Sequence, residues 1–171
     1  MVKQQTTKLK RPTADNPQIG MARYNMIKEA MEQYKRAMDA GFYIEAITLM
    51  ESAICDRLES LANIAFSPDD YSYSTIGQLV HLFRSKGKPI TPELANVLDA
   101  LSAWAKNRNN AIHEMVKLGP TNSNIGFVEK YKSLKQIAKQ GKDLFNAVKK
   151  EYKKNVALWD DLKTTNSSPV P

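Results

Sequence analysis

Apolar residues recur every three or four positions along most of this 171-residue chain, and that spacing restricts the possible folds more than any other feature. Side chains three or four positions apart share one face of an α-helix. No stretch alternates between apolar and polar residues as a half-buried strand does, and no repeat of fixed period occurs. The sequence therefore predicts an all-α fold, an up-and-down bundle of four long helices and one short helix.

Capping residues indicate where these helices begin and end. Asn16, Thr75 and Thr91 are the expected N-terminal caps, and glycines follow several of the expected ends. The predicted helices cover residues 17–41, 42–65, 75–87, 91–119 and 127 onward. We expect a disordered basic tail at 1–15, one helical domain at 16–160 and a flexible C-terminal tail at 161–171.

One charged side chain falls on the apolar stripe of the fourth predicted helix. On an ideal helix Arg108 lies near the centre of that stripe, so it should be buried. Asn109 and His113, which are four positions apart, lie on the flank and can face a cleft or a partner subunit. The stripe itself consists of Leu94, Val97, Leu101, Trp104, Ala105, Ile112 and Met115.

A carboxylate interrupts the second predicted helix in the same way. Glu51 falls in the middle of the apolar face, where an isolated charge costs several kcal/mol. Charged side chains in such positions are usually paired. We therefore predict that the side chains of Glu51 and Arg108 lie within about 6 Å of each other. The apolar face around Glu51 is formed by Ile44, Ile47, Ile54, Cys55, Leu58 and Ala62.

The composition excludes several classes of protein. Cys55 is the only cysteine, which rules out an intramolecular disulfide, and its register indicates a small buried side chain. Two distant histidines and one cysteine do not make a zinc site, so we expect neither metal nor cofactor. His81 has no acidic or cysteine pattern beside it, which favours a structural role. No apolar run of about 18 residues and no leader occur, so the sequence predicts a cytoplasmic protein without a membrane anchor.

The net charge of +7 favours anionic partners, and the positive charge is unevenly placed. A nucleic-acid backbone is a natural partner, and a solvated lysine-rich face that maintains solubility is the alternative. Charge alone does not separate these two interpretations. The basic residues are Lys3, Lys8, Lys10 and Arg11 in the N-terminal tail, and Lys130, Lys132, Lys135, Lys139, Lys142, Lys149, Lys150, Lys153 and Lys154 in the last helix.

Arg108 and His113 form an Arg-x4-His pattern whose chemistry suits attack at an RNA phosphodiester. A neutral His113 would take the proton from a ribose 2′-hydroxyl, or in protonated form donate one to the leaving 5′-oxygen. Arg108 would hold the non-bridging oxygens, and Asn109 would fix the imidazole tautomer or contact the phosphate. On one ideal helix Arg108 and His113 point about 140° apart, so a symmetric dimer would present them better than a single chain.

The segment RNNAIH (108–113), after a helix bearing ESAICDRLESL (51–61) and before a final long helix, resembles the HEPN superfamily of small helical ribonucleases and toxins. The resemblance spans about residues 40–150. It implies a metal-independent endoribonuclease with its active site at a homodimer interface. Carried over by position, Arg108 and His113 are the catalytic pair and Asn109 the polar residue that often follows the arginine, whereas Glu51 is added by the register argument. The implied partners are RNA, a second copy of the chain and an antitoxin or other regulatory protein, in a toxin or phage-defence setting.

One position departs from the family pattern. Members paired with a nucleotidyltransferase antitoxin often carry a tyrosine two residues after the histidine, where this chain has Met115, which argues against silencing by that route. Some members have also lost catalysis. Two alternatives to the enzyme therefore stay open: a non-catalytic helical binding or adaptor domain in which Arg108 only bridges to Glu51, and a basic nucleic-acid-binding module.

Overall fold

The computed structural model describes residues 17–66, 74–115, 117 and 126–166. All regular elements in these ranges are helices, four of them long and one short, which confirms the predicted all-α bundle. The predicted tail at 1–15 lies outside the described residues. The helices are α1 (Pro17–Ala40), α2 (Tyr43–Phe66), α3 (Ile76–Ser85), α4 (Pro92–His113) and α5 (Phe127–Asn166).

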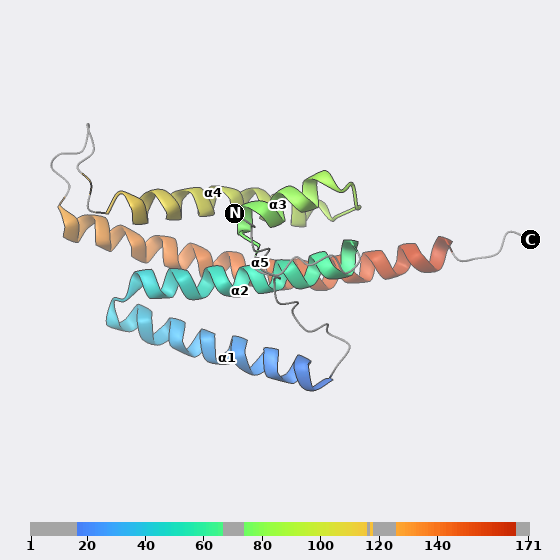
Figure 1. The fold of residues 1–171 in the computed structure, drawn as a ribbon, viewed down its shortest axis with the longest axis horizontal. Coiled ribbons are helices and arrows are strands. Elements are labelled where there is room, and N and C mark those ends of the chain that lie inside the picture. Colours follow the sequence, from blue (N-terminus) through green and yellow to red (C-terminus); the bar gives the residue numbers. More distant parts are fainter. Residues whose placement is uncertain (1–16, 67–73, 116, 118–125, 167–171) are drawn as a thin grey trace, which may run out of the picture.

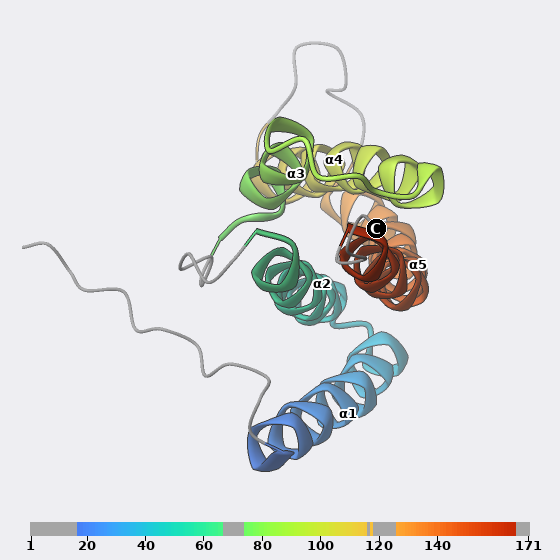
Figure 2. The same ribbon diagram turned by 90° about the vertical axis from the view of Figure 1, so that its right-hand side faces the viewer.

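The helices form three layers. α2 and α5 lie side by side in the middle, with α3 and α4 on one side and α1 on the other (Figure 2). α1 and α2 run in opposite directions, as do α4 and α5 (Figure 1). α3 packs against both α2 and α4, but only beside the N-terminal part of α4 (Figure 1). The C-terminal part of α4 therefore lies beyond α3, and this is the part that carries the predicted site residues.

The core follows the predicted helical stripes. Ile47, Ile54 and Leu58 on α2, and Leu101 and Trp104 on α4, are buried as expected. Burial of each such side chain contributes roughly 1.5–3 kcal/mol to the free energy of folding. The apolar faces of α1 and α4 therefore turn toward the central pair, α2 and α5. Met50, Leu98, Leu134, Ala138, Phe145 and Trp159 complete the centre of the core.

The turn between α1 and α2 is made by a glycine. Gly41 has a φ of 80°, a left-handed conformation that other residues adopt only with strain. The Phe42 amide then donates to the Ala37 carbonyl at 2.7 Å, which satisfies a carbonyl group at the end of α1. The first helix thus ends where the sequence predicted.

Three details differ from the sequence prediction. α4 ends at His113, not near Gly119, so His113 is the last helical residue. α5 continues to Asn166, which places the predicted domain boundary at 160 inside the helix. Ile44 is 40% exposed, because the first turn of α2 lies at the end of the bundle. Cys55 is partly buried and packs against the core.

The N-terminus of α4 is held by a polar network on α5. The N-cap Thr91 accepts a hydrogen bond from the Leu94 amide, as the sequence predicted. Asn155, which is fully buried, accepts from the Thr91 amide at 2.9 Å and donates to the Thr91 hydroxyl at 3.0 Å. The Thr91 hydroxyl in turn donates to the buried carboxylate of Glu151. Because each of these polar groups has a partner, the network fixes α4 against α5 without leaving an unsatisfied group there.

No helix in the described part of the chain is both long and apolar enough to cross a membrane. The longest helix, α5, carries lysines along most of its length. Its apolar residues form a single stripe that packs on α2 and α4.

Candidate active site

Arg108 and Glu51 form the predicted ion pair. The Arg108 Nη1 atom contacts a carboxylate oxygen of Glu51 across the space between α4 and α2. The Arg108 side chain is 12% exposed and the Glu51 side chain 31% exposed. The guanidinium is thus almost buried, as expected, whereas the carboxylate keeps one side open to solvent. Nη1 itself is enclosed and makes no aligned hydrogen bond, so charge attraction holds this pair.

Asn109 holds the other side of the guanidinium. Its Oδ1 atom accepts hydrogen bonds from Arg108 Nε at 3.2 Å and Nη2 at 2.8 Å. Asn109 is exposed, so this clamp lies on the solvent side of Arg108. It orients Arg108, a role that the sequence did not predict for Asn109. The Nη2 atom carries a second N–H that no described residue accepts, whereas Nη1 is enclosed.

Trp104 lies one turn before Arg108, and its ring packs against the guanidinium. The Arg108 Cζ atom is 5.6 Å from the centroid of the Trp104 ring, within the range of a cation–π contact. The Trp104 indole is buried, and its Nε1 donates to the Ile137 carbonyl on α5 at 2.9 Å. The orientation of Arg108 therefore depends on a tryptophan that is fixed from a third helix.

Gly141 on α5 leaves the space that the Trp104 ring occupies. A Cβ atom added at Gly141 would lie 2.7 Å from Trp104 Cζ2 and 3.2 Å from the Met50 Cβ atom. Real Cβ atoms do not approach this closely, so α5 can pass the indole only with glycine at 141. The sequence reasoning missed Gly141, although a lone glycine inside a helical pattern is a signal of close packing.

His113 lies at the end of the site and is exposed. Among the described residues it has no hydrogen bond or ion pair, so the expected contact with Asn109 is not formed. Arg108 points inward to Glu51 while His113 is outside, in accord with the divergence expected from their spacing. The structure thus brings Glu51, Arg108 and Asn109 together and leaves His113 apart.

Lys130 on α5 binds backbone carbonyl groups just after His113. The Glu114 amide, in the C-cap position, donates to the Asn110 carbonyl at 2.8 Å. The Lys130 ammonium donates to the carbonyl oxygens of Glu114 and Lys117. Cations near a helix C-terminus satisfy such carbonyl groups and the helix dipole. This contact explains why α4 ends six residues before Gly119, because α5 reaches the carbonyl groups that follow His113.

Aromatic and apolar side chains gather at the same end of the bundle. The rings of Tyr131 on α5 and Tyr43 are tilted against each other with centroids 5.5 Å apart, and the Tyr131 hydroxyl donates to the Gly41 carbonyl at 2.9 Å. These contacts join the α1–α2 turn to the start of α5, which also holds the end of α4 through Lys130. Four large apolar side chains in these segments are at least 40% exposed: Phe42, Ile44, Phe127 and Val128.

The site contains no metal-ligating cluster. No group of three or more His, Cys, Asp or Glu residues in the described ranges could hold a metal ion. His81, the other histidine, is exposed and lies on α3, which packs beside the N-terminal part of α4 and away from this site.

Comparison of the chain with protein-family models, with curated proteins and with solved structures gives no match in any of the three.

Proposed function

We propose that this protein is a metal-independent endoribonuclease of HEPN type, a toxin or phage-defence effector whose composite active site forms at a homodimer interface. The observation that carries the proposal is the oriented guanidinium of Arg108. It is almost buried, clamped by Glu51 and Asn109, and its Nη2 atom keeps a second N–H to donate. A charged group held in this way is suited to the developing charge of a phosphodiester, because it needs no reorganisation during the reaction.

The two roles in the reaction are divided between Arg108 and His113. His113 would take the proton from the ribose 2′-hydroxyl, and that oxygen would attack the adjacent phosphorus. The leaving 5′-oxygen would receive a proton from a protonated imidazole, and Arg108 would hold the non-bridging oxygens. Asn109 and Glu51 would act as positioning residues, because they touch Arg108 and fix its orientation.

Dimerisation is part of the proposal because Arg108 and His113 diverge within one chain. His113 lies at the end of the bundle where Phe42, Phe127 and Val128 expose apolar surface. Apolar side chains that are exposed together favour burial against a partner. A two-fold axis near this end would bring the His113 of one copy toward the site of the other. Sedimentation at micromolar concentration should give a dimer, and a strict monomer would contradict this part of the proposal.

The enzyme is tested by RNA cleavage in EDTA. Purified protein should cut single-stranded RNA between about pH 6 and 8 without added metal. His113→Ala should lose at least about 100-fold in rate, whereas His81→Ala, the matched change at the second histidine, should cut like the wild type. Intact RNA with folded, dimeric wild-type protein would end the enzyme proposal.

A second function is supported by the same contacts. Every nitrogen of the Arg108 guanidinium contacts Glu51 or Asn109, and His113 has no partner among the described residues. This arrangement also fits a non-catalytic binding or adaptor domain in which the Glu51–Arg108 bridge is structural. The His113→Ala variant separates the two, because an adaptor should keep its partner and its fold without this side chain.

A further inference from the structure

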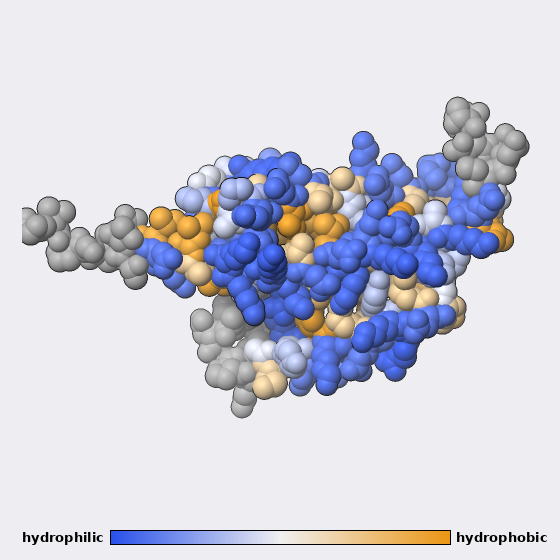
Figure 3. Space-filling view, turned by 180° about the vertical axis from the view of Figure 1, so that it is seen from behind, coloured by the Kyte–Doolittle hydropathy of each residue, from blue (hydrophilic) through white to orange (hydrophobic). Residues whose placement is uncertain are grey.

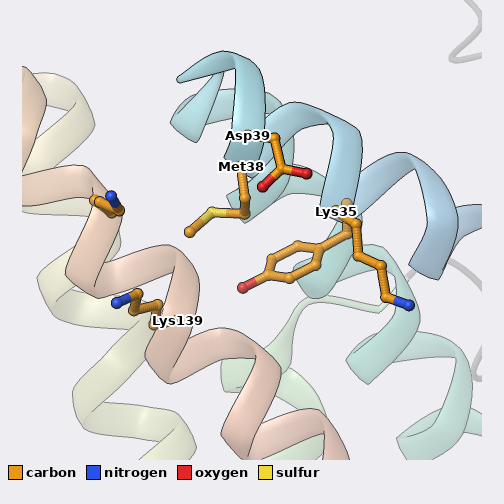
Figure 4. A pocket seen from close by; sticks show the side chains of 6 residues that line it. Lys35, Met38, Asp39 and Lys139 are labelled. Carbon is orange, nitrogen blue, oxygen red and sulfur yellow. The ribbon is translucent and has the colours of Figure 1, made fainter.

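Residues of α1 and α5 line a cleft. The helix α1 lies on the side of the α2/α5 layer opposite α4 (Figure 2). The volume of the cleft is about 510 Å³, and it is separate from the Arg108 site. Met38 and Asp39 on α1 lie across from Lys139 on α5, and Lys35 extends along the α1 side (Figure 4). The six lining residues are Tyr34, Lys35, Met38, Asp39, Lys135 and Lys139.

The cleft is positively charged. Three lysines and one aspartate line it, so the formal charge of the lining is three minus one, or +2. The surface over α5 and α1 on this side of the molecule is largely hydrophilic and hollowed between the two helices (Figure 3). A recessed surface of one sign concentrates its field and attracts counter-charges.

The lysines continue along α5 beyond the cleft. Lys135, Lys139, Lys142 and Lys149 fall within about 80° of one another around the helix axis and extend over about 21 Å. Lys142 is held inside this row, because its ammonium lies 5.4 Å from the Phe145 ring centroid and donates to the Met31 sulfur. The Lys149 ammonium lies 5.2 Å from the centroid of the same ring. The row is therefore a surface built from packed lysine stems and not only a set of free solvated chains.

Lys142 experiences both burial and the charges of other lysines. Burial lowers the pKa of Lys142, and the nearby charges of Lys149 and Lys35 lower it further. Lys35 of α1 and Lys142 of α5 thus lie close enough to interact, and Asp39 and Asp143 offset part of the positive charge nearby. Nearby anionic groups would relieve this repulsion, which gives a polyanion a favourable site.

Tyr34 shows which part of a nucleic acid this surface would contact. Its ring is buried and its hydroxyl donates to the Ala138 carbonyl at 3.3 Å, so no aromatic face is available for stacking with a base. Affinity would therefore come from the phosphates and be tolerant of sequence. A row of about 21 Å exceeds what a single phosphate needs, and the recessed cleft beside it suits a strand better than a flat bilayer.

We propose that the α1/α5 cleft and the lysine row beside it form an exosite for the phosphodiester backbone of single-stranded RNA. This inference rests on the proposed ribonuclease function and deepens it by naming where the substrate strand is held away from Arg108. The exosite raises affinity and leaves the chemical step to Arg108 and His113. Lys35, Lys135 and Lys139 are its binding residues.

The test is binding measured without cleavage. Fluorescence anisotropy with a fluorescein-labelled oligouridine of about 20 nucleotides is recorded in EDTA, with every variant in a His113→Ala background so that the strand stays intact. Lys139→Glu should weaken binding about three- to tenfold, and Lys35→Glu with Lys139→Glu should weaken it further. Lys106→Glu on α4, an exposed lysine with the same change in net charge, should alter the Kd less than about twofold. Between about 50 and 200 mM salt, each lost contact should reduce the slope of log Kd against log salt by about 0.7.

The outcomes separate this inference from the proposed function. Weaker binding in Lys139→Glu but not Lys106→Glu supports the exosite even if the wild type does not cut RNA, in which case the enzyme proposal fails alone. In an active enzyme, Lys139→Glu should raise KM and leave kcat unchanged. Equal Kd values for the two variants would overturn the exosite even if the wild type cuts. Phosphatidylglycerol vesicles that displace the RNA and bind the wild type more tightly than Lys139→Glu would also overturn it, because the surface would then serve a membrane and not a strand.

Discussion

The two ends of α4 both carry polar groups against neighbouring helices, but they differ in how completely those groups are paired. At the N-terminal end, Asn155 is fully buried and every polar atom of Thr91 that it faces has a partner. At the C-terminal end, Glu51 is partly exposed and His113 has no partner among the described residues. The polar groups at the N-terminal end of α4 are thus fully paired, whereas those at its C-terminal end are only partly paired.

This difference distinguishes a structural network from a candidate site. Groups that are satisfied within the fold contribute to stability, and they offer nothing to a ligand. The Arg108 guanidinium is oriented by its neighbours and keeps one N–H of Nη2 available, which is the condition for preorganised binding of an anion. A substitution in the paired N-terminal network should therefore lower the free energy of unfolding more than a substitution in the open C-terminal group.

The largest loss of stability is expected for Asn155→Ala. The change leaves the Thr91 amide without its acceptor and opens space at a fully buried position. We expect the free energy of unfolding to fall by about 2–3 kcal/mol in urea titrations. Asn146→Ala, at an exposed position of the same helix, should change it by less than about 0.5 kcal/mol. Equal effects of the two would show that the N-terminal network is not structural.

Gly141→Ala should have the next largest effect. The added methyl group collides with the Trp104 indole and Met50, and the resulting strain exceeds the gain in helix propensity. A net loss of about 1–2 kcal/mol is expected from thermal unfolding. Gly20→Ala in α1, where an added Cβ meets nothing within 4 Å, should be neutral or stabilising. If Gly141→Ala were stabilising too, the fixed position of Trp104 under Arg108 would be wrong.

Glu51→Gln should cost about 1 kcal/mol of unfolding free energy, because it leaves an almost buried guanidinium without its counter-charge. The matched change is Asp99→Asn, which breaks the ion pair with Arg84 between side chains that are 66% and 52% exposed. That exposed pair should contribute less than about 0.5 kcal/mol. Chemical denaturation of both variants at low and high salt tests the comparison, and a larger loss for Asp99→Asn would contradict it.

The smallest effect on stability belongs to His113→Ala. The imidazole is exposed and unpaired among the described residues, so its removal should change the unfolding free energy by less than about 0.5 kcal/mol at pH 8. The same variant is expected to lose RNA cleavage. A loss of stability as large as that of Asn155→Ala would instead assign His113 a structural role.

Much of the fold was predictable because helix formation depends on local spacing and caps. The capping box at Thr75 and Gln78 and the N-cap at Thr91 are present as the sequence indicated. The Glu51–Arg108 pair was also predictable, because two charges on apolar stripes need each other. The buried network around Asn155 was missed, although Asn155 continues the apolar stripe of Phe145, Val148 and Tyr152 and could have been noticed for the same reason as Glu51.

The sequence by itself determined the helices, their buried faces and the pairing of the two charges, since each follows from residues a few positions apart or from the cost of an unpaired ion. Only the tertiary structure decided where α4 ends. Lys130 on α5 binds the carbonyl group of Glu114, which lies 16 residues earlier in the chain and directly after His113. The tertiary structure also decided that Trp104 passes close to Gly141, and that lysines of α1 and α5 face a common cleft. Contacts between distant segments depend on how the helices pack, and no local pattern records them.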